Sequence, residues 1–366
     1  MTFSTSELSS SPFSFEQLPR HVERCLNDYF QHRWDEITKI GSPVVEAMSI
    51  LKNYVLNGGK RIRPMYAWVG FSSSYGWERT EFTPQAVLQA VSSLEFIQAC
   101  ALIHDDYIDS SDTRRGHPTV HRQAENIHNQ RRWSGSSQHF GASLSILIGD
   151  MAMVWADDMF HSTNLPTDAL TRARIPWEAM RTEVIGGQLL DIINEHSADE
   201  SIDRAHNVNR YKTAAYTIER PLHIGAALAG ASEKTIAALR AYGQDIGIAF
   251  QLRDDLLGVF GDPTITGKPA GDDLREGKRT VLIATALTLD PQRSDYIRTH
   301  LGQVTEAEDI AQLAQTLRDT GVEEHMEQLI SSLTESGIAH LEQCDLAPGG
   351  RDALIQLAHR ATARRT

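Results

Sequence analysis

The feature that most constrains this chain is a helical repeat of apolar residues along most of its length. Apolar side chains recur three and four positions apart over long segments, which is the spacing of one face of an α-helix. Alternating β-branched runs are rare, and no Asn-Gly or Asp-Gly turn joins two of them. The sequence therefore predicts an all-α fold, built as a single large helical bundle.

Eight segments carry the helical repeat most clearly, and further ones follow toward the C-terminus. They are residues 43–56, 64–71, 84–109, 143–160, 176–194, 202–228, 234–260 and 280–289. Thr83 and Pro84 mark one helix start, because a hydroxyl group caps free N–H groups and proline suits the first helical position.

The chain shows no internal repeat and no linker rich in proline, glycine or serine. We therefore expect one domain over residues 21–366. The serine-rich residues 1–20 are expected to form a disordered tail, and the polar segment 122–138 is expected to be an inserted loop.

Charge and cysteine content exclude several classes of partner and location. The 35 basic and 48 acidic residues among 366 give a net charge of −13, which argues against nucleic acid as a partner. Three separated cysteines indicate no disulfide framework and favour a reducing cytoplasm. Apolar runs such as 281–289 are too short to span a membrane, and the N-terminal residues lack the pattern of a signal peptide.

The segment 84–109 carries the first informative group of acids. Asp105 and Asp109 lie within about 40° of an apolar stripe when residues are placed 100° apart around a helix. Carboxylates on such a stripe cost several kcal/mol unless a cation compensates them. Their spacing suits Mg²⁺ shared with phosphate oxygens. A solvated acidic helix end remains the alternative interpretation.

A second pair of acids, Asp254 and Asp255, lies in the segment 234–260. Gln251, Gly247 and Gly243 lie within about 60° of Asp254 around the helix. Each glycine costs about 1 kcal/mol relative to alanine, so something is expected to approach the backbone there. Close helix packing would explain the glycines equally well, but it would leave the aspartates unexplained.

Isolated basic groups could bind phosphate in this otherwise acidic chain. Arginine suits bidentate contacts to diphosphate, and lysine suits point-charge neutralisation. The Gly-Gly-Lys sequence at 58–60 and the Gly-Lys sequence at 277–278 lack the frame of a Walker loop. The basic groups are Lys60, Arg61, Arg63, Arg114, Arg115, Lys212, Lys268 and Lys278.

Nine short motifs in fixed order resemble the trans-type isoprenyl diphosphate synthases, and most of all geranylgeranyl diphosphate synthases of actinobacterial type. The resemblance covers residues 40 to 290, approximately. The motifs are GGKRIRP (58–64), HDDYID (104–109), RRG (114–116), GD (149–150), GGQ (186–188), YKTA (211–214), FQLRDD (250–255), GKPAGDD (267–273) and GKRT (277–280).

The resemblance implies helices around a deep central cavity, a homodimer, and head-to-tail transfer of a prenyl group. Isopentenyl diphosphate would attack an allylic cation formed from dimethylallyl, geranyl or farnesyl diphosphate. Mg²⁺ would be the cofactor, with three ions per site and Mn²⁺ as an alternative. Metals and cations at the leaving diphosphate would stabilise the transition state more than the ground state.

The same resemblance assigns roles to individual residues. Asp105, Asp109 and Asp254 would bind metal, supported by Asp106 and Asp255. The residues facing the allylic diphosphate would be Arg114, Lys212, Lys268 and Lys278, with Gln188 and Gln251 as hydrogen-bond donors. Lys60, Arg63 and Arg115 would hold isopentenyl diphosphate, and Thr213 with its backbone would lie beside the nascent cation.

Three features depart from the family pattern. Gln98 stands where histidine is usual, which could weaken or retune the binding of isopentenyl diphosphate. Gly258 stands where the second cluster commonly has a further aspartate, so that cluster has one carboxylate fewer. The segment 122–138 has no counterpart in the simplest members of the family.

Product length in this family depends on residues four and five places before the first aspartate, here Ala101 and Cys100. Both are small, so the resemblance implies an open cavity and a C20 product, geranylgeranyl diphosphate. A farnesyl or longer-chain synthase remains the alternative. Ile97, or Trp155, Met159 or Phe160, could form the cavity floor, although core packing is the more common role of such residues.

Two further functions fit part of the pattern. A class I terpene cyclase also uses aspartates and Mg²⁺, but it would not need Lys60, Arg63 and Arg115 for a second diphosphate. A non-catalytic subunit of a heteromeric synthase would tend to lose an aspartate cluster, whereas both clusters here keep their leading pair.

Overall fold

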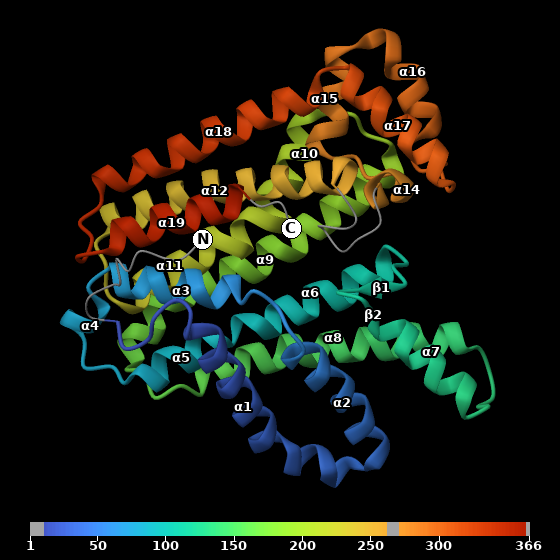
Figure 1. The fold of residues 1–366 in the computed structure, drawn as a ribbon. Helices are drawn as coiled ribbons and strands as arrows, with labels where there is room; N and C mark the ends of the chain where they lie inside the picture. Colours follow the sequence, from blue (N-terminus) through green and yellow to red (C-terminus); the bar gives the residue numbers. More distant parts are fainter. Residues whose placement is uncertain (1–10, 262–270, 364–366) are drawn as a thin grey trace. The chain divides into compact units, whose positions relative to one another are not determined.

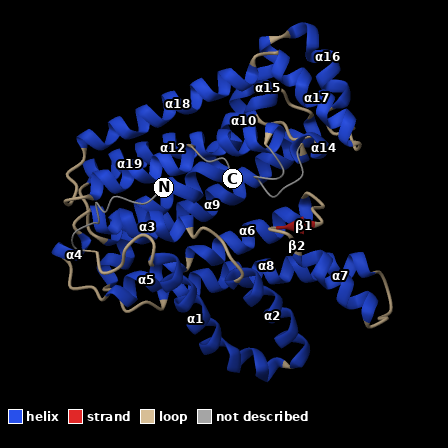
Figure 2. Ribbon diagram, in the orientation of Figure 1, coloured by secondary structure: helices blue, strands red, loops and turns tan. Residues whose placement is uncertain are grey.

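The fold comes from a computed structural model, which describes residues 11–261 and 271–363. These residues are almost entirely helical, and the strands among them are limited to one short hairpin (Figures 1 and 2). The prediction of an all-α fold is confirmed. The described chain divides into two compact units. That residues 21–366 form one domain stays a prediction.

The first unit comprises Met1–Ile175 and Ile224–Ala231. Its elements are α1 (Leu18–Ile40), α2 (Ser42–Leu56), α3 (Ile62–Ser73), α4 (Gly76–Arg79), α5 (Pro84–Ser92), α6 (Leu94–Ile108), β1 (Thr113–Arg114), β2 (His117–Pro118), α7 (Val120–Gln130), α8 (Ser137–His161) and the start of α9 (Thr167–Ser197).

Helices α6 and α8 lie side by side in the first unit, and α7 packs along α8 (Figure 1). Aromatic rings fill the core beside them. Phe96 of α6 meets Trp155 of α8 edge-on, with ring centroids 6.1 Å apart, and Phe30 of α1 lies 5.7 Å from the same indole ring. These contacts fix α6, which carries the first aspartates at its C-terminal end.

The second unit comprises Pro176–His223 and Ser232–Thr366. Most of α9 belongs to it. Its other elements are α10 (Ile202–Val208), η1 (Asn209–Glu219), the start of α11 (Arg220–Leu228), α12 (Glu233–Phe260), α14 (Asp272–Glu276), α15 (Val281–Leu289), α16 (Pro291–His300), α17 (Ala307–Asp319), α18 (Val322–His340), η2 (Leu341–Gln343) and α19 (Gly350–Thr362).

Helix α12 forms the centre of the second unit, with η1 and α18 packed along it. A Cβ on Gly247 would lie 2.6 Å from the Cα of Ala214 in η1, and one on Gly243 would lie 2.6 Å from the Cα of Glu219. The two glycines therefore allow close backbone packing. That is the structural alternative weighed from the sequence, and it accounts for both positions.

The predicted helix 202–228 contains an unexpected π-helical segment. Residues Asn209–Glu219 form η1, with α-helix before and after it. Such a stretch shifts side chains around the helix axis relative to regular α-helix, and π-segments are frequent at functional sites. Periodicity alone did not predict this change.

Two predicted boundaries are wrong. The segment 84–109 is interrupted at Ser93, whose hydroxyl donates to the carbonyl of Ala90 at 2.6 Å, and α6 ends at Ile108 with Asp109 as its C-cap. The segment 122–138 is not mainly a loop, because α7 covers Val120–Gln130. Only 131–136 connect α7 to α8.

The prediction of a disordered tail is wrong for residues 11–20, and residues 1–10 lie outside the described residues. Helix α1 begins at Leu18. Before it, Ser11 accepts a hydrogen bond from the indole of Trp68 at 3.0 Å, and Phe13 stacks on His21 with ring centroids 3.9 Å apart. Residues 11–20 are therefore held against the first unit.

Two helical stretches have the length and apolar composition of a membrane span, contrary to the expectation from run length. The stretch Pro84–Ile108 is 78% buried within the protein, as expected of core helices. Ser137–His161 is 39% buried, and Ile146, Leu147 and Val154 on it are exposed. Length and composition of this kind are weak evidence for a membrane span, since core helices also meet the same criteria.

Candidate active site

The C-terminal half of α6 brings the first aspartates to the edge of the apolar stripe. Val91 and Leu94 are fully buried, Gln98 and Ala101 are half-buried, and the side chain of Asp105 is 14% exposed. The stripe thus opens gradually toward solvent at the acids, as the helical angles predicted. Asp109 is half-buried at the helix end.

Asp106 is the most buried acid of the first cluster. It is fully buried and accepts a hydrogen bond from Nε of Arg114, whose Nη2 lies 3.8 Å from Oδ2 of Asp105. Burial raises the pKa of Asp106 to about 6, and the Arg114 guanidinium opposes this rise. The hairpin of β1 and β2 positions Arg114, so a cation from outside α6 partly compensates the charge of the cluster.

The predicted isopentenyl diphosphate residues lie in the same unit. Lys60 is exposed in the loop between α2 and α3, and Arg63 is 6% exposed in the first turn of α3. Arg115 lies in the turn of the hairpin, and its Nη1 donates to the carbonyl of Gly58 at 3.3 Å. This hydrogen bond connects the hairpin to the loop that carries Lys60.

Sequence reasoning missed the ion pair that holds this loop. Arg61 has a left-handed φ of 50° and is buried, and its Nη1 donates to Oε2 of Glu95 at 2.5 Å. Its Nη2 donates to the carbonyl of Val55 at 2.8 Å. Glu95 stands three residues before Gln98 on α6, so the pair ties the basic loop to the helix of the first aspartates. A buried Glu within an apolar helix is the signal that could have indicated a partner.

The second cluster lies on α12 in the other unit. Asp254 is half-buried, and Asp255 is 3% exposed. Gln251 donates to Oδ1 of Asp255 at 2.7 Å. Burial, followed by the charges of Asp273 and Asp254, raises the pKa of Asp255 to about 8, and the side-chain amides of Gln251 and Asn209 oppose this rise.

Helices α9 and η1 bring a further group together in the second unit. Nζ of Lys212 in η1 donates to the Asp191 carboxylate of α9. Gln188 lies one turn earlier on α9, and its buried Nε2 has no hydrogen-bond partner within the described ranges. Thr213 is half-buried beside Lys212. Asp191 was not predicted, although its i, i+3 spacing from Gln188 places both on one face of α9.

The last two predicted basic residues lie after α12. Lys268 lies outside the described residues. Lys278 follows α14, and its Nζ lies 2.8 Å from Oε2 of Glu276.

The three residues predicted to set chain length lie on α6, one to two turns before Asp105. Ile97 is fully buried, Cys100 is 5% exposed and Ala101 is half-buried. The Cys100 thiol lies 3.8 Å from Nδ1 of His104. Trp155, one of the candidate floor residues, contacts the aromatic core, which is the ordinary packing role weighed from the sequence.

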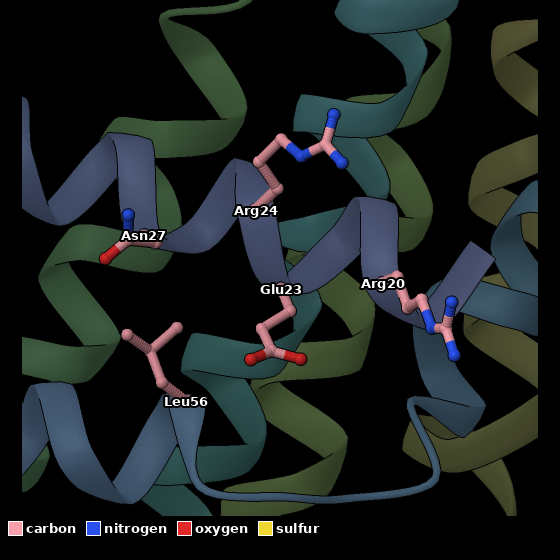
Figure 3. A pocket seen from close by; sticks show the side chains of 5 residues that line it. All are labelled: Arg20, Glu23, Arg24, Asn27 and Leu56. Carbon is pink, nitrogen blue, oxygen red and sulfur yellow. The ribbon is translucent and has the colours of Figure 1, made fainter. Parts of the chain in front are cut away.

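A surface pocket of about 360 Å³ lies elsewhere in the first unit, between α1 and the end of α2 (Figure 3). It contains none of the predicted residues. Its lining residues are Arg20, Glu23, Arg24, Asn27 and Leu56.

The predicted residues thus form two groups, each with carboxylates beside basic or amide side chains. Comparison with known proteins identifies the family to which the chain belongs. The polyprenyl synthetase family model matches residues 45–318. The chain belongs to that family. It is a trans-isoprenyl diphosphate synthase, a prenyltransferase, as the resemblance implied.

Individual synthases show how far the likeness extends. Geranylgeranyl pyrophosphate synthase from Corynebacterium glutamicum, solved with isoprenyl diphosphate and magnesium, is 56% identical. The match covers 96% of this chain and 100% of that one, with a TM-score of 0.94. Octaprenyl diphosphate synthase of Escherichia coli is 31% identical over 87% of this chain and 91% of that protein. The short chain isoprenyl diphosphate synthase of Methanocaldococcus jannaschii is 33% identical over 69% of each chain.

The carboxylates fit magnesium bound together with a diphosphate. Carboxylate oxygens are the ligands that Mg²⁺ prefers, and Mg²⁺ usually keeps several waters and shares substrate phosphates. Over residues 11–261 and 271–363, no three His, Cys, Asp or Glu side chains gather closely enough to hold a metal alone. Oδ2 of Asp106 and Oδ2 of Asp255 are buried and have no hydrogen-bond partner within the same ranges. The donors therefore suit magnesium, whose use is general in this family.

Proposed function

We propose that this protein condenses isopentenyl diphosphate with dimethylallyl, geranyl or farnesyl diphosphate to give mainly geranylgeranyl diphosphate. The observation that carries this proposal is the pair of carboxylate clusters, each beside basic or amide side chains, in a chain 56% identical to a geranylgeranyl pyrophosphate synthase. The basic groups for a second diphosphate argue against a terpene cyclase. The leading aspartate pair, which both clusters keep, argues against a non-catalytic subunit.

Isopentenyl diphosphate would bind to the first unit. Lys60 and Arg63 would contact its phosphates, with Arg115 opposite them in the hairpin turn. Gln98 replaces a residue that could carry charge, so it would contribute a neutral hydrogen bond. The Arg61–Glu95 ion pair would hold the Lys60 loop in place before substrate arrives.

The allylic diphosphate would bind to a second set of basic side chains. Arg114, Lys212, Lys268 and Lys278 would face it, and Gln188 and Gln251 would donate hydrogen bonds. Asp105, Asp109 and Asp254 would hold magnesium, supported by Asp106 and Asp255. Three ions per site, with Mn²⁺ as a substitute, would match the resemblance.

These residues would stabilise the charges that develop on the leaving diphosphate and on the allylic group during the reaction. When bound, magnesium would neutralise the negative charge that the leaving diphosphate gathers as its C–O bond breaks. The basic side chains stabilise the same charge, and the apolar residues of α6 exclude water from the allylic cation. Thr213 and its backbone would present partial negative charge to that cation. The released diphosphate can accept the proton that is lost, so no essential protein base is expected.

Chain length would be set on α6. Replacing Cys100 with Tyr should shorten the main product from C20 toward C15, because the larger ring would fill the space below Asp105. Chromatography of the dephosphorylated products measures the change, and Cys100→Ser is the matched control that leaves the space open. An unchanged product would remove this account of the cavity.

We also propose a cytoplasmic homodimer. Ile146, Leu147 and Val154 form an exposed apolar face on α8 that a second copy would cover. Light scattering during gel filtration would report a dimer, and Leu147→Glu should weaken it. Partition of the protein into vesicles with no dimer in solution would contradict this use of the face.

The activity itself is tested with the purified chain, Mg²⁺, isopentenyl diphosphate and each allylic diphosphate in turn. The proposal predicts a C20 diphosphate whose formation stops when EDTA removes the metal. Release of cyclic hydrocarbons would instead indicate a cyclase, and no turnover without a partner would indicate a regulatory subunit.

A further inference from the structure

The hairpin of β1 and β2 carries Arg114 and Arg115 but has little stability of its own. Each strand has two residues, and the chain turns at Arg115 and Gly116. Arg115 has a φ of 52°, a left-handed conformation that is unfavourable for a residue with a long side chain. An isolated hairpin is at best marginally stable in water, so other elements must hold these two arginines in place.

The N-cap residue of α7, Thr119, closes the base of this hairpin. Helix α7 begins directly after β2 (Figure 1), and Thr119 is buried with 1% of its surface exposed. Its N–H donates to the carbonyl of Asp112 at 3.1 Å, and its hydroxyl donates to the carbonyl of Ser111 at 2.8 Å. Thr119 therefore fastens the end of β2 to the two residues that lead into β1.

Two side chains from the first turn of α7 hold the two strands separately. Nε of Arg122 donates to Oδ1 of Asp112, just before β1, at 2.7 Å. Nε2 of Gln123 donates to the carbonyl of Pro118, the last residue of β2, at 2.7 Å. A further hydrogen bond from Nη1 of Arg122 to Oε2 of Glu125, at 2.8 Å, fixes the guanidinium group within α7. Both strands are thus attached to the same helical turn.

Helix α7 is itself attached to three other helices of the first unit. A Cβ on Gly141 of α8 would lie 2.6 Å from the carbonyl oxygen of His121, so the two backbones touch there. The His121 ring meets the ring of Tyr107 on α6 edge-on, with centroids 5.6 Å apart. At the other end of α7, Arg131 pairs with Glu46 of α2. The first turn of α7 is therefore a fixed support for the hairpin.

We propose that the first turn of α7, with Thr119 as the main positioning residue, holds Arg114 and Arg115 in place for the diphosphate groups of the substrates. The segment 122–138 would then have a function in substrate binding, through Arg122 and Gln123. The inference rests on the proposed roles of the two arginines. Without this support the hairpin would populate other conformations, and substrate affinity would fall by the fraction of molecules that are not competent to bind.

Hydrogen exchange of the full chain, measured by mass spectrometry on peptides that cover residues 111–119, follows the hairpin directly. Thr119→Val keeps the shape of the side chain and removes its hydroxyl. It should speed exchange of this segment about tenfold, because the hairpin opens more often once a bond at its base is lost. Exchange at the rate of the unaltered protein would contradict the proposal.

The KM for isopentenyl diphosphate, at saturating geranyl diphosphate and Mg²⁺, measures the effect on substrate binding. Thr119→Val should raise this KM about tenfold and change kcat less than about twofold, because a displaced Arg115 weakens binding rather than bond breaking. Thr119→Ser retains the hydroxyl and should keep KM within about twofold of the unaltered value. A serine variant as impaired as the valine variant would leave Thr119 only a packing role and overturn the proposal.

Gln123→Leu tests the same support with little risk to folding, because the hydrogen bond of Gln123 to Pro118 lies at the surface. It should speed exchange of residues 111–119 and raise the KM for isopentenyl diphosphate, each about threefold. If Thr119→Val does not fold, unchanged exchange and unchanged KM in Gln123→Leu would overturn the proposal.

Thr163 provides a matched control in the same unit. It lies just after α8 with 7% of its surface exposed, and its hydroxyl donates to the carbonyl of Phe160 at 3.0 Å. Thr163→Val makes the same chemical change and should lower the melting temperature similarly. Its exchange over residues 111–119 and its KM should stay within about twofold of the unaltered values. Equal effects of the two valine variants would show general destabilisation and contradict a positioning role for Thr119.

Arg115→Ala distinguishes the inference from the function on which it rests. If Arg115→Ala raises the KM for isopentenyl diphosphate and Thr119→Val does not, the inference is wrong and the proposed function stands. If Arg115→Ala leaves that KM unchanged, the placement of isopentenyl diphosphate is wrong, whereas faster exchange in Thr119→Val would still support the attachment of the hairpin to α7.

Discussion

The two aspartate clusters differ in how neighbouring side chains compensate the charge of the buried acid. In the first, a guanidinium from the hairpin donates directly to buried Asp106, and the pKa of that acid rises only to about 6. In the second, burial and then the charge of Asp273 raise the pKa of Asp255 to about 8, and only neutral amides oppose this larger rise. The chain itself thus neutralises Asp106 more fully than Asp255.

This difference suggests that the two clusters respond differently to ligand and metal. The first cluster is preorganised by Arg114, so its geometry should persist without ligand. Asp255 favours its protonated form at neutral pH, and a bound cation would reverse that preference. We therefore expect the second cluster to respond more strongly to magnesium.

The largest expected effect is on catalysis. Asp254→Ala and Asp105→Ala should each lower kcat by about 1000-fold, because each removes a proposed metal ligand at the leaving diphosphate. Steady-state assays over a range of Mg²⁺ concentration measure this. Activity of Asp254→Ala that recovers fully with excess Mg²⁺, while Asp105→Ala stays inactive, would show that the second cluster only tunes affinity.

The next effect concerns stability. Arg114→Leu should lower the free energy of unfolding by about 3–5 kcal/mol, because it leaves the Asp106 carboxylate buried beside no guanidinium. Gln251→Leu removes a neutral donor and should cost about 1–3 kcal/mol. Urea denaturation compares the two variants.

A double variant provides the control for this stability prediction. Asp106→Asn should recover much of the stability lost in Arg114→Leu, because the buried charge is then absent. Equal losses in Arg114→Leu and Gln251→Leu, with no recovery, would contradict the contrast between the clusters.

The third prediction concerns how the stability of the metal-free protein depends on pH. The folded pKa of Asp255 lies above its unfolded value, so the folded state binds a proton that the unfolded chain releases, and stability should fall as pH rises from about 4 to 8. For Asp106 the fall should end near pH 6. Melting temperatures measured in EDTA across this range test both.

Asparagine variants isolate each acid in that experiment. Asp255→Asn should gain a few kcal/mol over the unaltered protein at pH 8 and little at pH 4. Asp106→Asn should show its gain by pH 6. Identical pH profiles for the unaltered protein and Asp255→Asn would remove the electrostatic distinction.

Helical spacing predicted where the first aspartates stand on their helix. Asp105 follows the helical repeat of α6, and Asp109 is the C-cap of the same helix, so local spacing was enough to place these two acids near each other. The sequence also predicted Thr83 as an N-cap, and the structure shows its hydroxyl accepting a hydrogen bond from the N–H of Ala86.

Contacts between distant segments were not predictable in this way. The Arg61–Glu95 pair and the approach of Asp273 to Gly258 join residues from different elements, and neither leaves a local pattern. Helix α7 was interpreted as a loop because its buried face includes His121 and His128 among few aliphatic residues. Because α7 is mostly polar and its apolar stripe is narrow, the apolar repeat did not indicate a helix there.

The central claim is that Asp105, Asp109 and Asp254 hold the metal that binds the diphosphate. The most direct test is a crystal structure of the protein with Mn²⁺ and pyrophosphate, in which anomalous scattering locates the ions. The account predicts ions about 2.1 Å from carboxylate oxygens of Asp105, Asp109 and Asp254, with pyrophosphate oxygens among their ligands. Ions bound at other residues, with these carboxylates directed away from pyrophosphate, would contradict it.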